Sequence, residues 1–82
     1  MRRINIRVLF FGATASAVGK RSVDLSVAEG SKSGNGFDEI INEFPKLTAH
    51  KLLYSLNQNY ATGDEILSDG DELAIFTAVS GG

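Results

Sequence analysis

Apolar and polar residues alternate along the first part of the chain with a period of two, which is typical of half-buried β-strands. One alternating run covers residues 4–11 and a second covers residues 21–27. Leu9 and Phe11 make the second half of the first run apolar on both faces, so we expect that half to be central in the sheet or covered on both sides. The small residues at 12–19 predict a turn, and the two strands would then form an N-terminal hairpin.

The spacing of apolar residues changes to that of a helix in the middle of the chain. From Phe37 to Phe44 they recur at i, i+3, i+4 and i+7, which places them on one face of an amphipathic helix. Pro45 predicts that this helix ends near Phe44. Gly34 and Gly36 each cost about 1 kcal/mol in a helix relative to alanine, so we expect the helix to begin near residue 35 or 36.

The rest of the chain returns to strands and turns. The expected elements are a strand at 52–56, a turn at 57–59, a short edge strand at 60–61, a loop at 62–65, a turn at 69–71 and a last strand at 73–76. This order predicts an α+β domain of the ubiquitin-like β-grasp type, with a mixed sheet of about four to five strands curled over one main helix. Residues 1–76 would form the domain, and residues 77–82 a flexible, extended C-terminal tail that ends in Gly-Gly.

Composition excludes most kinds of enzyme. The chain has 82 residues, enough for one small domain, and its 43% of hydrophobic and 22% of charged residues are typical of globular proteins. It has no cysteine, which excludes a disulfide framework, a thiolate zinc site and a cysteine nucleophile. Its single histidine, His50, lies in a polar stretch and is expected on the surface. We therefore expect no metal site.

Charge and hydropathy favour a protein that binds neither nucleic acid nor membrane. The net charge is −2, whereas phosphate recognition needs an excess of lysine and arginine. No stretch approaches the roughly 20 apolar residues of a membrane span. Arg2-Arg3 before an apolar run resembles a secretory signal, but Arg7 interrupts that run. We therefore expect a cytoplasmic protein.

The charges are unevenly distributed along the chain. Five basic residues precede the first acidic one, Asp24, and the last twenty residues carry acidic residues without a basic one. These late acidic residues are Asp64, Glu65, Asp69, Asp71 and Glu72. We interpret them as solvated turns; the alternative is a surface that faces a basic strip on a partner and speeds encounter.

The chain ends in Ser80-Gly81-Gly82. Without Cβ atoms, two glycines form a thin and pliable segment that can enter a narrow tunnel. Six extended residues span roughly 20 Å, which would carry the terminal carboxylate of Gly82 into a neighbouring active site. A frayed tail explains the same residues equally well, so the ending alone leaves both interpretations open.

Several segments together resemble a known family. These are Ile6-Arg7-Val8-Leu9-Phe10-Phe11, Asn57-Gln58, Leu67-Ser68-Asp69-Gly70-Asp71-Glu72-Leu73 and the ending Ala78-Val79-Ser80-Gly81-Gly82. In this order they resemble the small subunits of molybdopterin synthase, the MoaD-type sulfur carriers of the ubiquitin-like MoaD/ThiS family. The likeness extends over essentially the whole chain. It departs from the family at Thr77-Ala78, where two prolines are usual, and near Ala15, where a basic residue is common.

The resemblance implies a mechanism. In this family an ATP-using enzyme, related to ubiquitin-activating enzymes, adenylates the C-terminal glycine, which would be Gly82. Sulfide then displaces AMP and leaves a thiocarboxylate. The tail, here Val79, Ser80 and Gly81, inserts into the large synthase subunit, and the sulfur passes to cyclic pyranopterin monophosphate during molybdenum cofactor synthesis. The chain would bind no cofactor, lack catalytic activity alone, and assemble with the large subunit as a heterotetramer.

Phe76 and Tyr60 match positions where the family places apolar side chains on its partner-binding face. Leu73 and Ile75 share the opposite face of the last strand, so only one of the two sets can be fully in the core. We expect Phe76 to belong to the interface, because large exposed apolar side chains on small domains usually mark partner surfaces. The alternatives are that Phe76 faces the helix and that Tyr60 serves packing alone.

Three alternative functions remain open at this stage. The same sulfur chemistry could serve another product, such as thiamin. A ubiquitin-like modifier would instead join Gly82 to lysines of target proteins, and it needs the same activated carboxylate. A plain interaction module with an incidental Gly-Gly ending would need neither.

Overall fold

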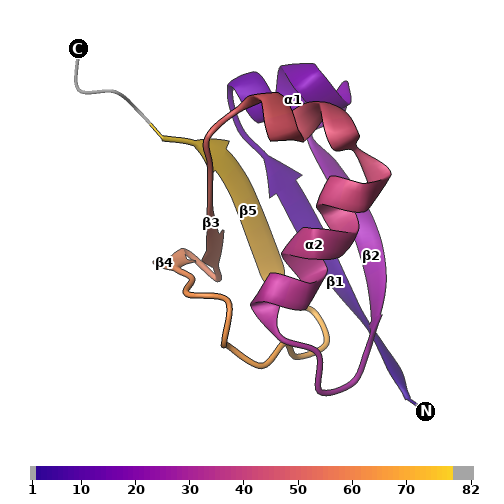
Figure 1. The fold of residues 1–82 in the computed structure, drawn as a ribbon. Coiled ribbons are helices and arrows are strands. Elements are labelled where there is room, and N and C mark those ends of the chain that lie inside the picture. The colour runs from indigo at the N-terminus through magenta and orange to yellow at the C-terminus, as the bar shows by residue number, and fades with distance from the viewer. Residues whose placement is uncertain (1, 79–82) are drawn as a thin grey trace.

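The computed structural model describes residues 2–78, which form a mixed β-sheet with one long helix across one face (Figure 1). The elements in chain order are β1 (Arg3–Phe10), α1 (Ala13–Val18), β2 (Ser22–Ala28), α2 (Ser33–Glu43), the 3-10 helix η1 (Pro45–Ala49), β3 (Leu52–Leu56), β4 (Asn59–Tyr60) and β5 (Glu72–Thr77). The five strands are ordered β2-β1-β5-β3-β4. β1 and β5 are parallel, and the other neighbouring strands are antiparallel. The predicted β-grasp fold is confirmed.

Alternation along the strands produces the core. Every second residue of β1 is buried, beginning with Ile4, and the same holds for Leu73 and Ile75 on β5. Ile40 from α2 and Leu47 from η1 cover these side chains and are themselves fully buried. Each such burial contributes about 1.5–3 kcal/mol, so the sheet and helix are held together mainly by this one apolar layer.

The connection between the first two strands differs from the prediction. β1 and β2 do pair antiparallel, with Val8 opposite Val23. The predicted turn at residues 12–19 is wrong, because residues 13–18 form the short helix α1. Gly12 and Gly19 flank this helix with positive φ angles of 58° and 79°, so the chain reverses at its two ends rather than within it. Alanine-rich segments also favour helix over turn.

Of the two expectations for the apolar half of β1, the central position is confirmed and the cover over both faces is wrong. β1 is central in the sheet, but α2 lies on one face only (Figure 1). Leu9 pairs with Ala74 and is half-buried on the opposite face, and the Phe11 side chain is 53% exposed. The apolar residues at this end of β1 therefore contribute to an open surface.

α2 begins earlier than predicted, at Ser33. The amide N–H of Gly34 donates to the carbonyl oxygen of Gly63 at 3.0 Å, so a helix end that normally lacks partners is satisfied by a loop. A Cβ atom at Gly34 would lie 3.1 Å from the same oxygen. At Gly36 a Cβ would lie 3.3 Å from Leu67 Cδ1. Both glycines thus allow close approach of the loop, which compensates for their poor helix propensity.

Candidate functional site

The strand that leads to the C-terminal tail is firmly held on both sides. β5 lies between β1 and β3, and the Ile75 carbonyl accepts a hydrogen bond from the Phe11 amide at 3.2 Å. On the other side the Ala78 amide donates to the Lys51 carbonyl at 3.0 Å. Pairing therefore continues one residue beyond the end of β5 at Thr77. The predicted tail residues Val79, Ser80, Gly81 and Gly82 lie outside the described residues.

Phe76 lies on the sheet face opposite α2. Its strand neighbours Leu73 and Ile75 are fully buried, which places the core on the helix side and Phe76 on the outer side, where it is half-buried. Phe76 pairs with Leu53 on β3, and its ring centroid lies 6.1 Å from that of Tyr60, with the planes tilted by 58°. The structure thus brings together the two residues that the sequence singled out.

Two further apolar residues extend this surface. Leu53 is 40% exposed beside Phe76, and Phe11 lies at the same end of the sheet; Tyr60 is the most open, at 78%. We call Phe11, Leu53, Tyr60 and Phe76 the outer apolar patch. The sequence did not single out Leu53, although its parity on β3 sets it apart from the inward residues 52, 54 and 56. The role of the patch in partner binding stays a prediction.

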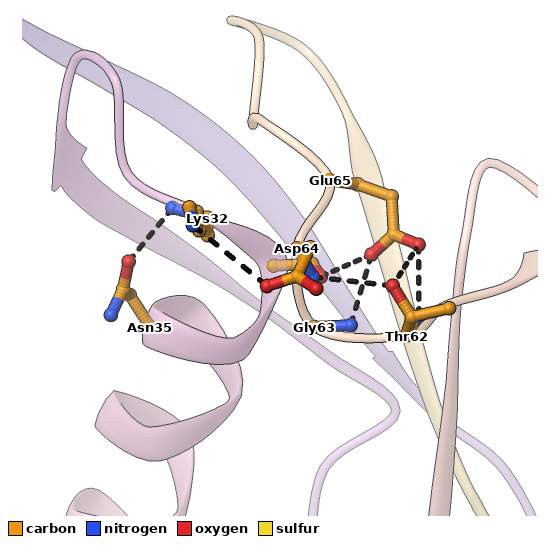
Figure 2. Close-up of polar contacts among 7 residues, drawn as sticks. Lys32, Asn35, Thr62, Gly63, Asp64 and Glu65 are labelled. Carbon is orange, nitrogen blue, oxygen red and sulfur yellow. Dashed lines mark hydrogen bonds and ion pairs between the residues drawn. The ribbon is translucent and has the colours of Figure 1, made fainter.

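A polar cluster fixes the loop at the far end of β5. The Glu65 carboxylate accepts hydrogen bonds from the Ser33 hydroxyl at 2.6 Å, from the Thr62 amide at 2.8 Å and from the Gly63 amide at 3.1 Å (Figure 2). Beside it, Lys32 Nζ lies 3.8 Å from an Asp64 carboxylate oxygen. The hydrogen bond from Ser33, followed by that from Thr62, lowers the pKa of Glu65 to about 2.

The acidic residues near β5 lie in solvent-accessible turns and loops, as expected, and three of them also hydrogen-bond to the backbone. Besides Glu65, the Asp69 carboxylate accepts the Asn5 amide at 2.8 Å, and the Asp71 carboxylate accepts the Ser68 amide at 2.7 Å. These carboxylates close loops by satisfying backbone donors.

The described residues offer little other chemistry. Within residues 2–78 no three His, Cys, Asp or Glu side chains gather as a metal ion would require, and His50 is exposed. In the same range no helix has the length and apolar character needed to cross a membrane. What the arrangement can do is present a chain end from a rigid strand beside an apolar surface.

The chain is similar to known proteins in both sequence and fold. The model of the ThiS family matches residues 8–82. A Mycobacterium tuberculosis protein named molybdopterin synthase sulfur carrier subunit is 33% identical over 82 residues, which are 96% of this chain and 99% of that protein. The crystal structure of SAMP1 from Haloferax volcanii superposes with a TM-score of 0.85 at 26% identity, covering 95% of this chain and 99% of that one.

A second structure contains two different chains. It is the protein–protein complex of subunits 1 and 2 of the molybdopterin-converting factor from Helicobacter pylori. Its matching chain has a TM-score of 0.68 and 21% identity, covering 96% of this chain and all of that one. At this identity the likeness shows the fold.

Proposed function

The chain belongs to the ThiS family, and we propose that it acts as the sulfur-carrier subunit of a molybdopterin synthase. The observation that carries the proposal is the match, over nearly the full length of both chains, to the Mycobacterium tuberculosis sulfur carrier subunit. The ending Ser80-Gly81-Gly82 supplies the terminal carboxylate that such a carrier needs. The proposed compartment is the cytoplasm, where ATP is available for activation.

The proposed chemistry takes place at the carboxylate of Gly82. On an activating enzyme, a carboxylate oxygen attacks the α-phosphorus of ATP, and pyrophosphate leaves. A sulfide-level donor then attacks the carbonyl carbon of the acyl-adenylate, and AMP leaves with the electron pair of the broken bond. The product is a thiocarboxylate. Adenylation is needed because a carboxylate oxygen is a poor leaving group, and the chain's lack of cysteine means that no internal thiol can compete for the acyl group.

Delivery of the sulfur is proposed to use the tail and the outer apolar patch together. Phe76 and Tyr60 would pack against the large subunit, while Val79, Ser80, Gly81 and Gly82 enter its active site and the sulfur passes to cyclic pyranopterin monophosphate. The Helicobacter pylori complex of subunits 1 and 2 supports a partner of this kind. Because β5 is bonded on both sides, the point on the domain from which the tail follows is fixed before docking. The heterotetramer stays a prediction.

The experiment that tests this function is intact-mass analysis of the untagged chain isolated from its own cells. A free chain with one sulfur in place of one oxygen at Gly82 would establish a sulfur carrier. Adding purified large subunit and cyclic pyranopterin monophosphate should then return the mass to that of the carboxylate. A chain that never carries sulfur under conditions of molybdenum cofactor synthesis would contradict the proposal.

One observation favours a second candidate function. Structures with the same fold, including one 26% identical, come from proteins titled small archaeal modifier protein or SAMP1. A modifier would join Gly82 to lysine side chains through an isopeptide bond. The same mass analysis, extended to lysine adducts after proteolysis, would detect that linkage, and the two functions do not exclude each other.

A further inference from the structure

Basic residues gather at the end of the domain from which the tail departs. Four of the eight lysines and arginines lie there: Lys20 and Arg21 after α1, Lys46 in η1 and Lys51 before β3. All four are exposed. We call them the basic collar. Because β1 and β5 are parallel, both strands end at this same side of the sheet, and α1 lies beside their ends (Figure 1).

Backbone hydrogen bonds join two residues of the collar to the ends of β5 and of its neighbour β1. The Lys51 carbonyl accepts the Ala78 amide at 3.0 Å, and the Arg21 carbonyl accepts the Phe10 amide at 2.8 Å, on the strand next to β5. Lys20 and Arg21 line one surface hollow at α1, and Lys46 lines another with Val18 at the end of that helix. The collar therefore extends around α1 to the exit of the tail.

The acidic residues have the opposite distribution. Five of the ten lie between residues 64 and 72, before β5 begins or at its first residue, at the end of the sheet away from the tail. Glu43, at the end of α2, lies beside Lys46. A chain with a net charge of −2 thus presents a locally positive surface around the exit of its tail. At 0.15 M salt such a field extends about 8 Å, enough to orient an approaching protein.

We propose that the basic collar meets an acidic rim around the tail-binding cleft of the activating enzyme, and that this charge pairing sets the rate of their encounter. The inference rests on the proposed function. The activating enzyme is the partner of choice because the carrier must bind it and leave again in every cycle. Charge pairs at a hydrated interface accelerate association. Buried apolar contacts, in contrast, slow release of the bound partner. The outer apolar patch is assigned to the large subunit in the proposed function.

The test compares charge reversals at the two ends of the domain. The collar variant carries Lys20→Glu and Lys51→Glu. The matched control carries Arg2→Glu and Lys32→Glu, which cause the same change in net charge just before β1 and α2, at the opposite end of the sheet from the end of β5. The rate of pyrophosphate release by the purified activating enzyme gives kcat/KM for each chain. In 50 mM salt we expect the collar variant to lose about tenfold in kcat/KM with kcat unchanged, and the loss to shrink in 500 mM salt.

Three other outcomes are possible, and each contradicts a different part of the proposal. Equal kcat/KM for the collar variant and the control in 50 mM salt overturns the role of the collar. Normal activation combined with weaker binding to the large subunit assigns the collar to that subunit and overturns the choice of partner. If the activating enzyme does not activate the unaltered chain, the proposed function itself is overturned. The collar and control variants test only the role of the collar. Circular dichroism of both variants verifies that the fold is kept.

Discussion

The hydroxyl of Thr14 lies 2.9 Å from the carbonyl oxygen of Ile75, although the two residues are 61 positions apart in the chain. The same hydroxyl lies 2.7 Å from the Phe11 carbonyl and accepts the Phe11 amide at 2.9 Å. Its single proton is therefore shared between two carbonyls. Thr14 is fully buried, so these contacts join α1 to the end of β5 in a region that water does not reach.

Replacing Thr14 with valine is expected to lower the free energy of unfolding by about 1–3 kcal/mol, because the backbone groups of Phe11 and Ile75 each lose one of their hydrogen-bond partners while the shape is kept. Urea denaturation measures this change. Thr14→Ser keeps the hydroxyl and loses a methyl group, so it should cost less than Thr14→Val. If valine is tolerated as well as serine, the hydroxyl does not hold α1 to β5.

Glu65 should make stability depend on pH in the acid range. Its pKa is about 2 in the folded chain, below the ordinary value of 4.5, mainly because of the hydrogen bond from Ser33. The stabilisation is therefore complete above about pH 4.5 and is lost as the pH falls from there through 2. Glu65→Gln should lower the urea midpoint at pH 7 and reduce its fall between pH 5 and 2.

The control for Glu65 is Glu39→Gln, which removes an exposed carboxylate of α2. It should leave both the midpoint at pH 7 and its pH dependence close to those of the unaltered chain. An identical pH profile for Glu65→Gln and the unaltered chain would show that the carboxylate does not stabilise the loop.

Gly34→Ala is expected to destabilise the domain, although alanine is the better helix former by about 1 kcal/mol. The new Cβ would lie 3.1 Å from the Gly63 carbonyl oxygen. That oxygen accepts the Gly34 amide, and the Gly63 amide donates to the Glu65 carboxylate, so the backbone at Gly63 is held in place. Overpacking against a fixed backbone costs about 1–3 kcal/mol, so a net loss of about 1 kcal/mol is expected in thermal or urea unfolding.

Gly36→Ala is the matched comparison for Gly34. Its Cβ would meet Leu67 Cδ1 at 3.3 Å, the end of a flexible side chain that can shift. It should therefore be tolerated better than Gly34→Ala. The reverse order would mean that core packing, and not the loop backbone, limits the start of α2.

Phe76→Ala should weaken binding to the large synthase subunit by more than about 1 kcal/mol in calorimetric titration, if the outer apolar patch is an interface. Ile66→Ala is the control, because Ile66 is also apolar and is 58% exposed, but it lies outside the patch. An unchanged Kd together with a lower Tm would assign Phe76 to packing within the sheet alone.

Deleting Gly82, or adding one residue after it, should abolish sulfur transfer while folding and most of the affinity for the large subunit are kept. The patch and the described domain are untouched, whereas the carboxylate is displaced or removed. Thiocarboxylate formation, followed by intact mass, measures the effect. Full activity of either variant would contradict every function that depends on the C-terminal carboxylate, including conjugation to lysines.

Periodicity was sufficient to predict the sheet and α2, because one-sided burial leaves a clear alternation in the sequence. It placed Phe76 on the opposite face of β5 from Leu73 and Ile75 but left open which face is the core. It failed where local and tertiary effects compete. Residues 13–18 are small enough for either a turn or a helix, and the flanking glycines decide the outcome. The start of α2 at Ser33 depends on a loop thirty residues away, which no local pattern reveals.

The candidate site, like the fold, was predicted only in part. Tyr60 and Phe76 were found by resemblance, and the structure adds that their rings are neighbours. Glu65 was missed because an acidic residue in a polar loop carries no sign of the four donors that surround it. The basic collar was missed for a related reason, since its members come from three separate segments that only the fold brings together.

The position of β5 at the centre of the sheet determines when the chain can fold during synthesis. Without β5, the strands divide into two separate pairs, β1 with β2 and β3 with β4, and isolated hairpins are marginal in water. β5 is synthesised after the other four strands, so the native sheet forms only once all five have been made. Chains terminated before β5 would therefore remain unfolded and open to proteolysis.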